Sequence, residues 1–83
     1  MIGQAIDLST WRVLASTRQV RDAVAGRHED DRSQWTLGVR IGGPTAWLIP
    51  VRSKREAVKT WASLETLVKF AEDCGLDGLR IEL

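Results

Sequence analysis

Four cations fall within eight positions of the chain: Arg52, Lys54, Arg55 and Lys59. Lysine and arginine bind the phosphates of nucleic acids with an affinity that falls as salt rises. The same residue types also protect the edge strand of a sheet from aggregation. Both interpretations stay open from the sequence. If the phosphate interpretation holds, Arg18 and Arg21 would extend this surface, provided that the first helix packs beside it.

We expect no catalytic residue, metal ligand or cofactor site in this chain. The one histidine, His28, lies in the polar run HEDD, whose spacing matches no zinc, calcium or magnesium motif. The one cysteine, Cys74, falls on the apolar face of an expected helix, where it acts as a small hydrophobic residue. The glycines of GVRIGG do not lead into a helix and therefore form no phosphate-binding loop. The sequence thus predicts a binding protein and not an enzyme.

Tryptophan is the other residue type that bears on binding. Four occur in 83 residues, all in or beside expected strands: Trp11, Trp35, Trp47 and Trp61. Core packing is the favoured interpretation, because buried aromatic rings contribute a large apolar area. An exposed tryptophan would instead anchor a protein interface or stack on a base.

The C-terminal third predicts a helix and a strand. Leu64, Leu67, Val68 and Ala71 recur at helical spacing, which indicates a helix over residues 64–74. Ser63 is placed to cap its start, and Gly75 to end it in the left-handed conformation. Leu79, Ile81 and Leu83 alternate with charged residues, so Leu79–Leu83 is expected to be a half-buried strand paired in the sheet.

The middle third predicts a hairpin. Alternation over residues 35–41 indicates a strand, GGPT supplies the turn, and residues 46–51 form the return strand. Pro50 cannot donate to a ladder, so this return strand is expected at a sheet edge or in a bulge. Residues 56–62 are a candidate for a further short strand.

The N-terminal third is interpreted as a strand followed by a helix. As one helix, residues 11–25 would present apolar side chains on two opposite sides, which a small domain rarely buries. Residues 10–15 are therefore predicted as a strand. Residues 16–26 are predicted as a helix, since Ser16 and Gln19 have capping-box spacing.

These elements predict one α+β domain over residues 1–83. A small antiparallel sheet of 3–5 strands would be packed by two helices, in the order β-α-β-β-(β)-α-β. Without the extra strand this is the ferredoxin-like order. A plain meander with its helices on one face is the alternative.

The charge is segregated although its sum is only +1. A basic middle and an acidic C-terminal end could bind an anionic partner, or could neutralise each other across a homodimer. The single cysteine excludes an internal disulfide. Without a signal peptide or a long apolar run, the expected compartment is the cytoplasm, with no membrane contact.

Four stretches of this chain are similar to one known group of proteins. They are STWRVLASTRQVRDAVAG, the pattern W-x-L-x-x-R-x-G-G, RSKR-x-x-x-KTWASLETLVKF and the closing GLDGLRIEL. Together they resemble the small ParC-type partition-associated proteins of plasmids and integrative elements. The resemblance implies a non-catalytic accessory role in partition or stable maintenance, through contact with DNA or a partition protein. It assigns no site residues.

An interaction protein of another class is the alternative. A small protein inhibitor, such as a phage- or plasmid-encoded inhibitor of a host nuclease complex, or a homodimeric scaffold would bind through exposed Trp and Leu side chains. Salt distinguishes the two hypotheses, because binding to phosphates weakens steeply with salt and apolar binding does not.

Overall fold

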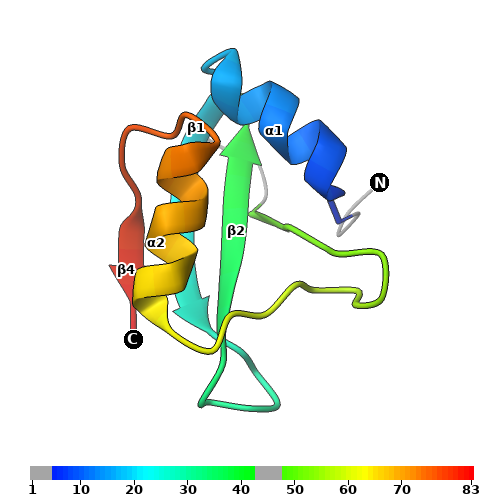
Figure 1. Ribbon diagram of the computed structural model, residues 1–83, viewed down its shortest axis with the longest axis vertical. Helices are drawn as coiled ribbons and strands as arrows, with labels where there is room; N and C mark the ends of the chain where they lie inside the picture. Colours follow the sequence, from blue (N-terminus) through cyan, green and yellow to red (C-terminus); the bar gives the residue numbers. More distant parts are fainter. Residues whose placement is uncertain (1–4, 43–47) are drawn as a thin grey trace.

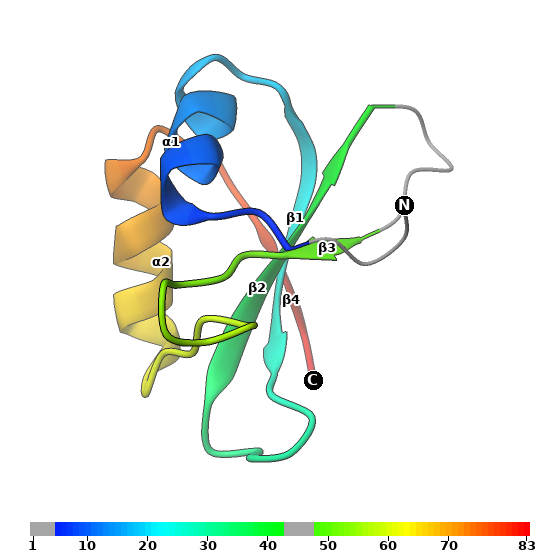
Figure 2. The ribbon, with the colours of Figure 1, turned by 90° about the vertical axis from the view of Figure 1, so that its right-hand side faces the viewer.

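The computed structural model describes residues 5–42 and 48–83, and it has two helices on one face of a four-stranded sheet (Figure 1, Figure 2). The elements are α1 (Leu8–Ser16), β1 (Val20–Arg27), β2 (Trp35–Ile41), β3 (Ile49–Pro50), α2 (Leu64–Asp73) and β4 (Arg80–Glu82). The predicted α+β class with two helices is confirmed. The ferredoxin-like order is wrong, because the first two elements are a helix and then a strand, not the reverse.

The sheet has the strand order β3-β2-β1-β4 and is mixed. β1 pairs antiparallel with β2, and β2 antiparallel with β3, as in a meander. β4 pairs with β1 in parallel, so the expectation of a purely antiparallel sheet is wrong. The cause is α2, which carries the chain from the β3 edge across the sheet to the β4 edge, and such crossovers produce parallel strands.

Helix α1 replaces the strand predicted over residues 10–15. Asp7 caps it, accepting a hydrogen bond from the backbone N–H of Thr10 at 2.8 Å. The helix buries Trp11 and Ala15 and ends at Ser16. The two opposite apolar sides that argued against a helix over residues 11–25 belong to two elements, since Val20 and Val24 lie in the strand that follows.

Strand β1 replaces the helix predicted over residues 16–26. Its register against β2 shifts between Val20 and Asp22, so the alternation of side chains is interrupted at Arg21. Its core-facing residues are the small Ala23 and Ala25, both buried. Alanine favours helices in isolation, and the bulge hides the period of two, so the sequence pattern was misleading here.

The hairpin of β2 and β3 is confirmed for the described residues, with β3 limited to Ile49–Pro50 where the sequence predicts a strand over residues 46–51. Residues 43–47, which hold most of the predicted turn and the start of that strand, lie outside the described residues. Pro50 sits in the edge strand, as predicted. The outer side of β3 is met by Ile6, whose N–H donates to the Pro50 oxygen at 2.9 Å, while the Arg52 N–H donates to the Ile6 oxygen at 2.8 Å. This edge is therefore covered by the N-terminal segment.

The further strand predicted over residues 56–62 is wrong. Only Trp61 makes a sheet-like contact there, exchanging two backbone hydrogen bonds with Trp35 at 2.8 and 2.9 Å. The residues before it form a loop.

Helix α2 agrees with the prediction within one residue. The hydroxyl of Ser63 accepts from the Thr66 N–H at 3.2 Å. Gly75, with φ of +100°, ends the helix, and the Leu76 N–H donates to the Ala71 oxygen at 3.0 Å. This is the left-handed C-terminal motif in which glycine carries no steric penalty.

β4 is paired in the sheet, as predicted, but it is not half-buried. All three of its residues are exposed, because β4 is the second edge of the sheet.

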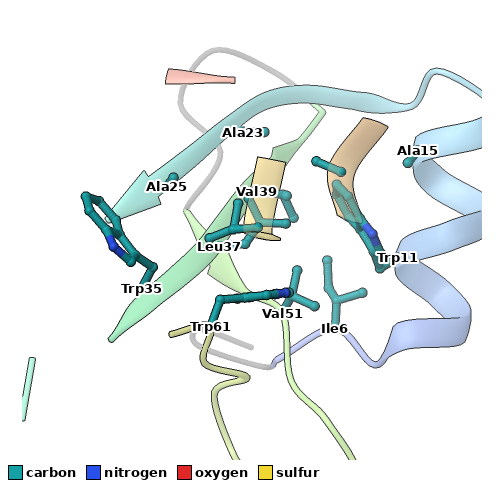
Figure 3. Close-up of a cluster of buried hydrophobic side chains, with 12 residues drawn as sticks. Ile6, Trp11, Ala15, Ala23, Ala25, Trp35, Leu37, Val39, Val51 and Trp61 are labelled. Atoms are coloured by element: carbon teal, nitrogen blue, oxygen red, sulfur yellow. The ribbon is translucent and has the colours of Figure 1, made fainter. Parts of the chain in front are cut away.

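The core lies between the helices and the sheet (Figure 3). Trp11, Trp35 and Trp61 are buried in it, so the core interpretation is confirmed for these three; Trp47 lies outside the described residues. Phe70 of α2 contacts two of them, with ring centroids 6.1 Å from Trp11 and 5.2 Å from Trp61. The Nε1 donor of Trp11 is buried and has no partner among the described residues.

Candidate nucleic-acid interface

The basic loop, residues 52–59, leaves the covered β3 edge and returns to the core at Trp61. Its base is fixed on both sides. The Val51 N–H donates to the Leu37 oxygen of β2 at 2.9 Å, and the Lys59 N–H donates to the Val51 oxygen at 2.8 Å. The loop therefore projects from the buried Val51 at a defined place and is not a free segment.

Inside the loop, the only acid of the segment is bound by hydroxyl groups. The Glu56 carboxylate accepts from the Ser53 hydroxyl at 3.3 Å and from the Thr60 hydroxyl at 3.1 Å. The Glu56 N–H in turn donates to the Ser53 hydroxyl at 3.1 Å, and the Ser53 N–H donates to the Glu56 oxygen at 3.2 Å. These bonds close the loop and hold the half-buried carboxylate at the wall of a hollow that Glu29 and Asp30 also line.

Three of the four cations of the loop point to solvent. Arg52, Lys54 and Arg55 are exposed, and none of them forms an ion pair within the described part of the chain. Arg52 lies near the start of α1: the pKa of Asp7 is lowered mainly by hydrogen bonds from Thr10, with a smaller contribution from the charge of Arg52. Lys54 and Arg55 are thus free to meet external anions. Arg52 is exposed too, but its Nε donates to the backbone oxygen of Ser53 at 3.2 Å, and Asp7 lies near its charge.

Lys59 differs from the other three. It is half-buried, and its Nζ lies 5.1 Å from the ring centroid of Trp61. A cation over an indole face is attracted by the ring quadrupole. Lys59 therefore stabilises the base of the loop through its contact with Trp61, in addition to carrying a positive charge.

Arg18 and Arg21 do not join the basic loop. Arg18 lies in the turn after α1 and pairs with Asp77, which leads into β4, at 2.6 Å. Arg21 lies in β1, two strands away from β3, and borders Arg80 of β4 in an open hollow. Both belong to the β4 side of the sheet. The sequence predicts that Arg18 and Arg21 extend the basic surface only if the first helix carries them and packs beside it. Neither residue lies on a helix, so this condition is not met.

A second group of charged side chains lies on the helix-free face of the sheet, and the sequence does not predict it. Asp22 of β1 accepts from Arg40 of β2 at 2.6 Å and from Arg80 of β4 at 2.8 Å. The sequence does not predict this group, because it favours a helix over residues 16–26 and so gives Asp22 no place in the sheet.

The HEDD run is organised by hydrogen bonds within itself and from Ser33. Nδ1 of His28 accepts from the backbone N–H groups of Asp30 at 3.0 Å and Asp31 at 3.2 Å. The Ser33 hydroxyl and N–H lower the pKa of the Asp31 carboxyl by donating to it. Within residues 5–42 and 48–83, no three potential metal ligands gather at one point.

Comparison with known proteins gives no relative: no family model, no curated protein and no solved structure matches this chain. The ParC-type resemblance therefore stays a prediction. In the described residues, neither helix is long and apolar enough to cross a membrane.

Proposed function

We propose that this chain is a non-catalytic binding module whose basic loop contacts the phosphate backbone of duplex DNA. One observation carries the proposal. The single acid of the loop, Glu56, is held by Ser53 and Thr60, while Arg52, Lys54 and Arg55 are exposed and free of carboxylate partners among the described residues. The loop thus presents positive charge outward.

Protection of a strand edge does not account for these cations. Lysine and arginine protect an edge when they lie on the edge strand itself. Here the cations lie in a loop after the strand, and the β3 edge is already covered by Ile6 and interrupted by Pro50. The positive charge is therefore available for a partner.

The expected affinity is modest and depends on salt. Each phosphate contact lowers the slope of log K against log salt by about 0.9 for duplex DNA. With three contacts, raising salt from about 50 to about 200 mM weakens binding roughly 40-fold. Contacts of this kind carry no base specificity.

The ParC-type resemblance supports a biological setting for this contact. In that setting the chain is an accessory factor for partition or stable maintenance of a plasmid or other mobile element, and it acts on DNA directly or together with a partition protein.

The alternative is a protein inhibitor or homodimeric scaffold anchored by exposed Trp and Leu side chains. Its tryptophan anchors have no support among the described residues, because Trp11, Trp35 and Trp61 are core residues. Its leucine anchors keep support, because Leu48 and Leu83 are exposed.

Fluorescence anisotropy of a labelled DNA duplex tests the proposal with two charge-matched variants. Lys54→Glu/Arg55→Glu changes the basic loop; Arg21→Glu/Lys69→Glu makes the same change in net charge at exposed positions elsewhere. We expect the loop variant to lose binding and the control to retain most of it. Equal loss in both would mean that only net charge matters. Absence of wild-type binding at low salt would contradict the proposal and direct the search to protein partners.

A further inference from the structure

The two edges of the sheet differ in how they meet solvent. β3 is blocked by Pro50 and covered by the backbone of Ile6. β4 has β1 on one side and, among the described residues, no strand on the other. It carries no proline, and its protections are its length of three residues and the charges of Arg80 and Glu82.

The β4 edge also exposes large apolar side chains. Ile81 is 49% exposed and Leu83 is 86% exposed. Ile81 is in register with the buried Ala25 of β1, so it lies on the helix face of the sheet. Both side chains would gain from burial against a neighbour at this edge.

The sequence of this edge is complementary to itself. When LRIEL (79–83) is paired antiparallel with a second copy around Ile81, each Arg80 lies opposite a Glu82. On the other face, Ile81 lies opposite Ile81, and each Leu79 lies opposite a Leu83. Opposite charges and apolar pairs directly across two strands stabilise their pairing.

We propose that β4 is a homodimerisation edge, at which a second copy of this chain pairs antiparallel around Ile81. The arrangement is a closed two-fold interface in which the same patch serves both copies. It joins the two sheets into one and places both pairs of helices on the same face. The basic loop lies at the opposite edge of the sheet and remains free (Figure 1).

The charged residues are already arranged for this pairing. Arg80 and Glu82 are in register with Val24 and Gly26 of β1, on the helix-free face. Asp22 accepts from Nη2 of Arg80 at 2.8 Å and so holds the guanidinium, which remains about half exposed. The Glu82 carboxylate has no side-chain partner within the described residues and is available to the Arg80 of a second copy.

Other pairings of the same edge are less favourable. Parallel pairing in register would place Arg80 beside Arg80 and Glu82 beside Glu82, and like charges across strands are destabilising. A slip by one residue would move the apolar side chains of one copy to the opposite face. The antiparallel register is therefore the one that satisfies both faces.

Two single charge reversals test this register. Arg80→Glu leaves two acids on the edge, and Glu82→Arg leaves two arginines, so each variant repels its own copy. A mixture of the two variants restores both ion pairs. By sedimentation analysis, we expect the wild type to dimerise with rising concentration, each variant to dimerise at least about tenfold more weakly, and the equimolar mixture to recover dimerisation.

A matched control and a folding check accompany the test. Glu29→Arg makes the same charge change as Glu82→Arg in the β1–β2 loop and should dimerise like the wild type. Thermal unfolding verifies each variant. If Arg80→Glu loses stability because the new carboxylate faces Asp22, Glu82→Arg tests the register by itself, because the wild-type Glu82 carboxylate forms no ion pair within the described part of the chain.

Three results would overturn the proposal: a wild type that stays monomeric up to roughly 1 mM, variants that dimerise as strongly as the wild type, or a mixture of folded variants that fails to recover. None of these outcomes depends on DNA. The dimer and the proposed DNA contact therefore stand or fall separately.

Discussion

At the scale of single residues, the position that most directly tests the core is Leu67. It is fully buried on α2, which packs against β2. In a domain of 83 residues the core is small, so each large buried side chain contributes a substantial part of the stability.

Leu67→Asp should prevent stable folding, because it places an unpaired charge in an apolar site. Leu67→Ala should retain the fold and lower the free energy of unfolding by about 2–5 kcal/mol. Urea unfolding followed by circular dichroism measures both. Lys69→Asp, at an exposed position of the same helix, is the control. A cooperative transition of Leu67→Asp at the wild-type midpoint would show that this face of α2 is not buried.

Gly38 allows Leu48 to lie against β2. A Cβ at Gly38 would be 2.8 Å from Cγ of Leu48, closer than two carbon atoms can approach. We expect Gly38→Ala to lower the free energy of unfolding by about 1–3 kcal/mol. In a Leu48→Ala background the same change should cost much less, and a double-mutant cycle measures this coupling. Additive effects would contradict the contact.

At the scale of elements, the sequence predicted α2 and β2 well, because each has an uninterrupted apolar period and α2 has caps at both ends. It failed for α1 and β1, whose types are exchanged in the prediction, although the predicted break after residue 15 lies close to the end of α1 at Ser16. Residues 10–15 alone are too short to show the helical period that starts at the Asp7 cap, and the bulge of β1 hides its period of two. A period can be read only when the element that carries it has been delimited.

The candidate site could be predicted only where its residues are neighbours in the sequence. The basic loop could be found from composition, since its four cations are neighbours in sequence. The Arg40–Asp22–Arg80 group could not, because its partners lie 18 and 58 residues apart and meet only in the folded sheet.

Strand β4 is predicted to be part of the folded unit in spite of its exposure. Deleting residues 79–83 removes the parallel partner of β1, the Arg80–Asp22 ion pair and the contact of Leu79 with the core. We expect a lower melting temperature in a thermal unfolding experiment at low protein concentration, where dimers are not populated. An unchanged melting temperature would mean that these residues are a tail.

At the scale of the whole molecule, two surfaces with different chemistry lie at opposite edges of one sheet. The basic loop follows β3, and the self-complementary strand is β4 (Figure 1). Because the two edges share no side chain, substitutions at one should leave the measurement at the other nearly unchanged. In a dimer paired through β4, the two basic loops would lie at the outer ends of the joined sheet.

The measurement that tests the central claim most directly is the salt dependence of duplex DNA binding by the wild type and by Lys54→Ala/Arg55→Ala. Contacts from Arg52, Lys54 and Arg55 predict a slope of log K against log salt of about −2.7 for the wild type and about −0.9 for the variant. Equal slopes for the two proteins, or no binding at about 50 mM salt, would contradict a DNA-contacting role for the basic loop.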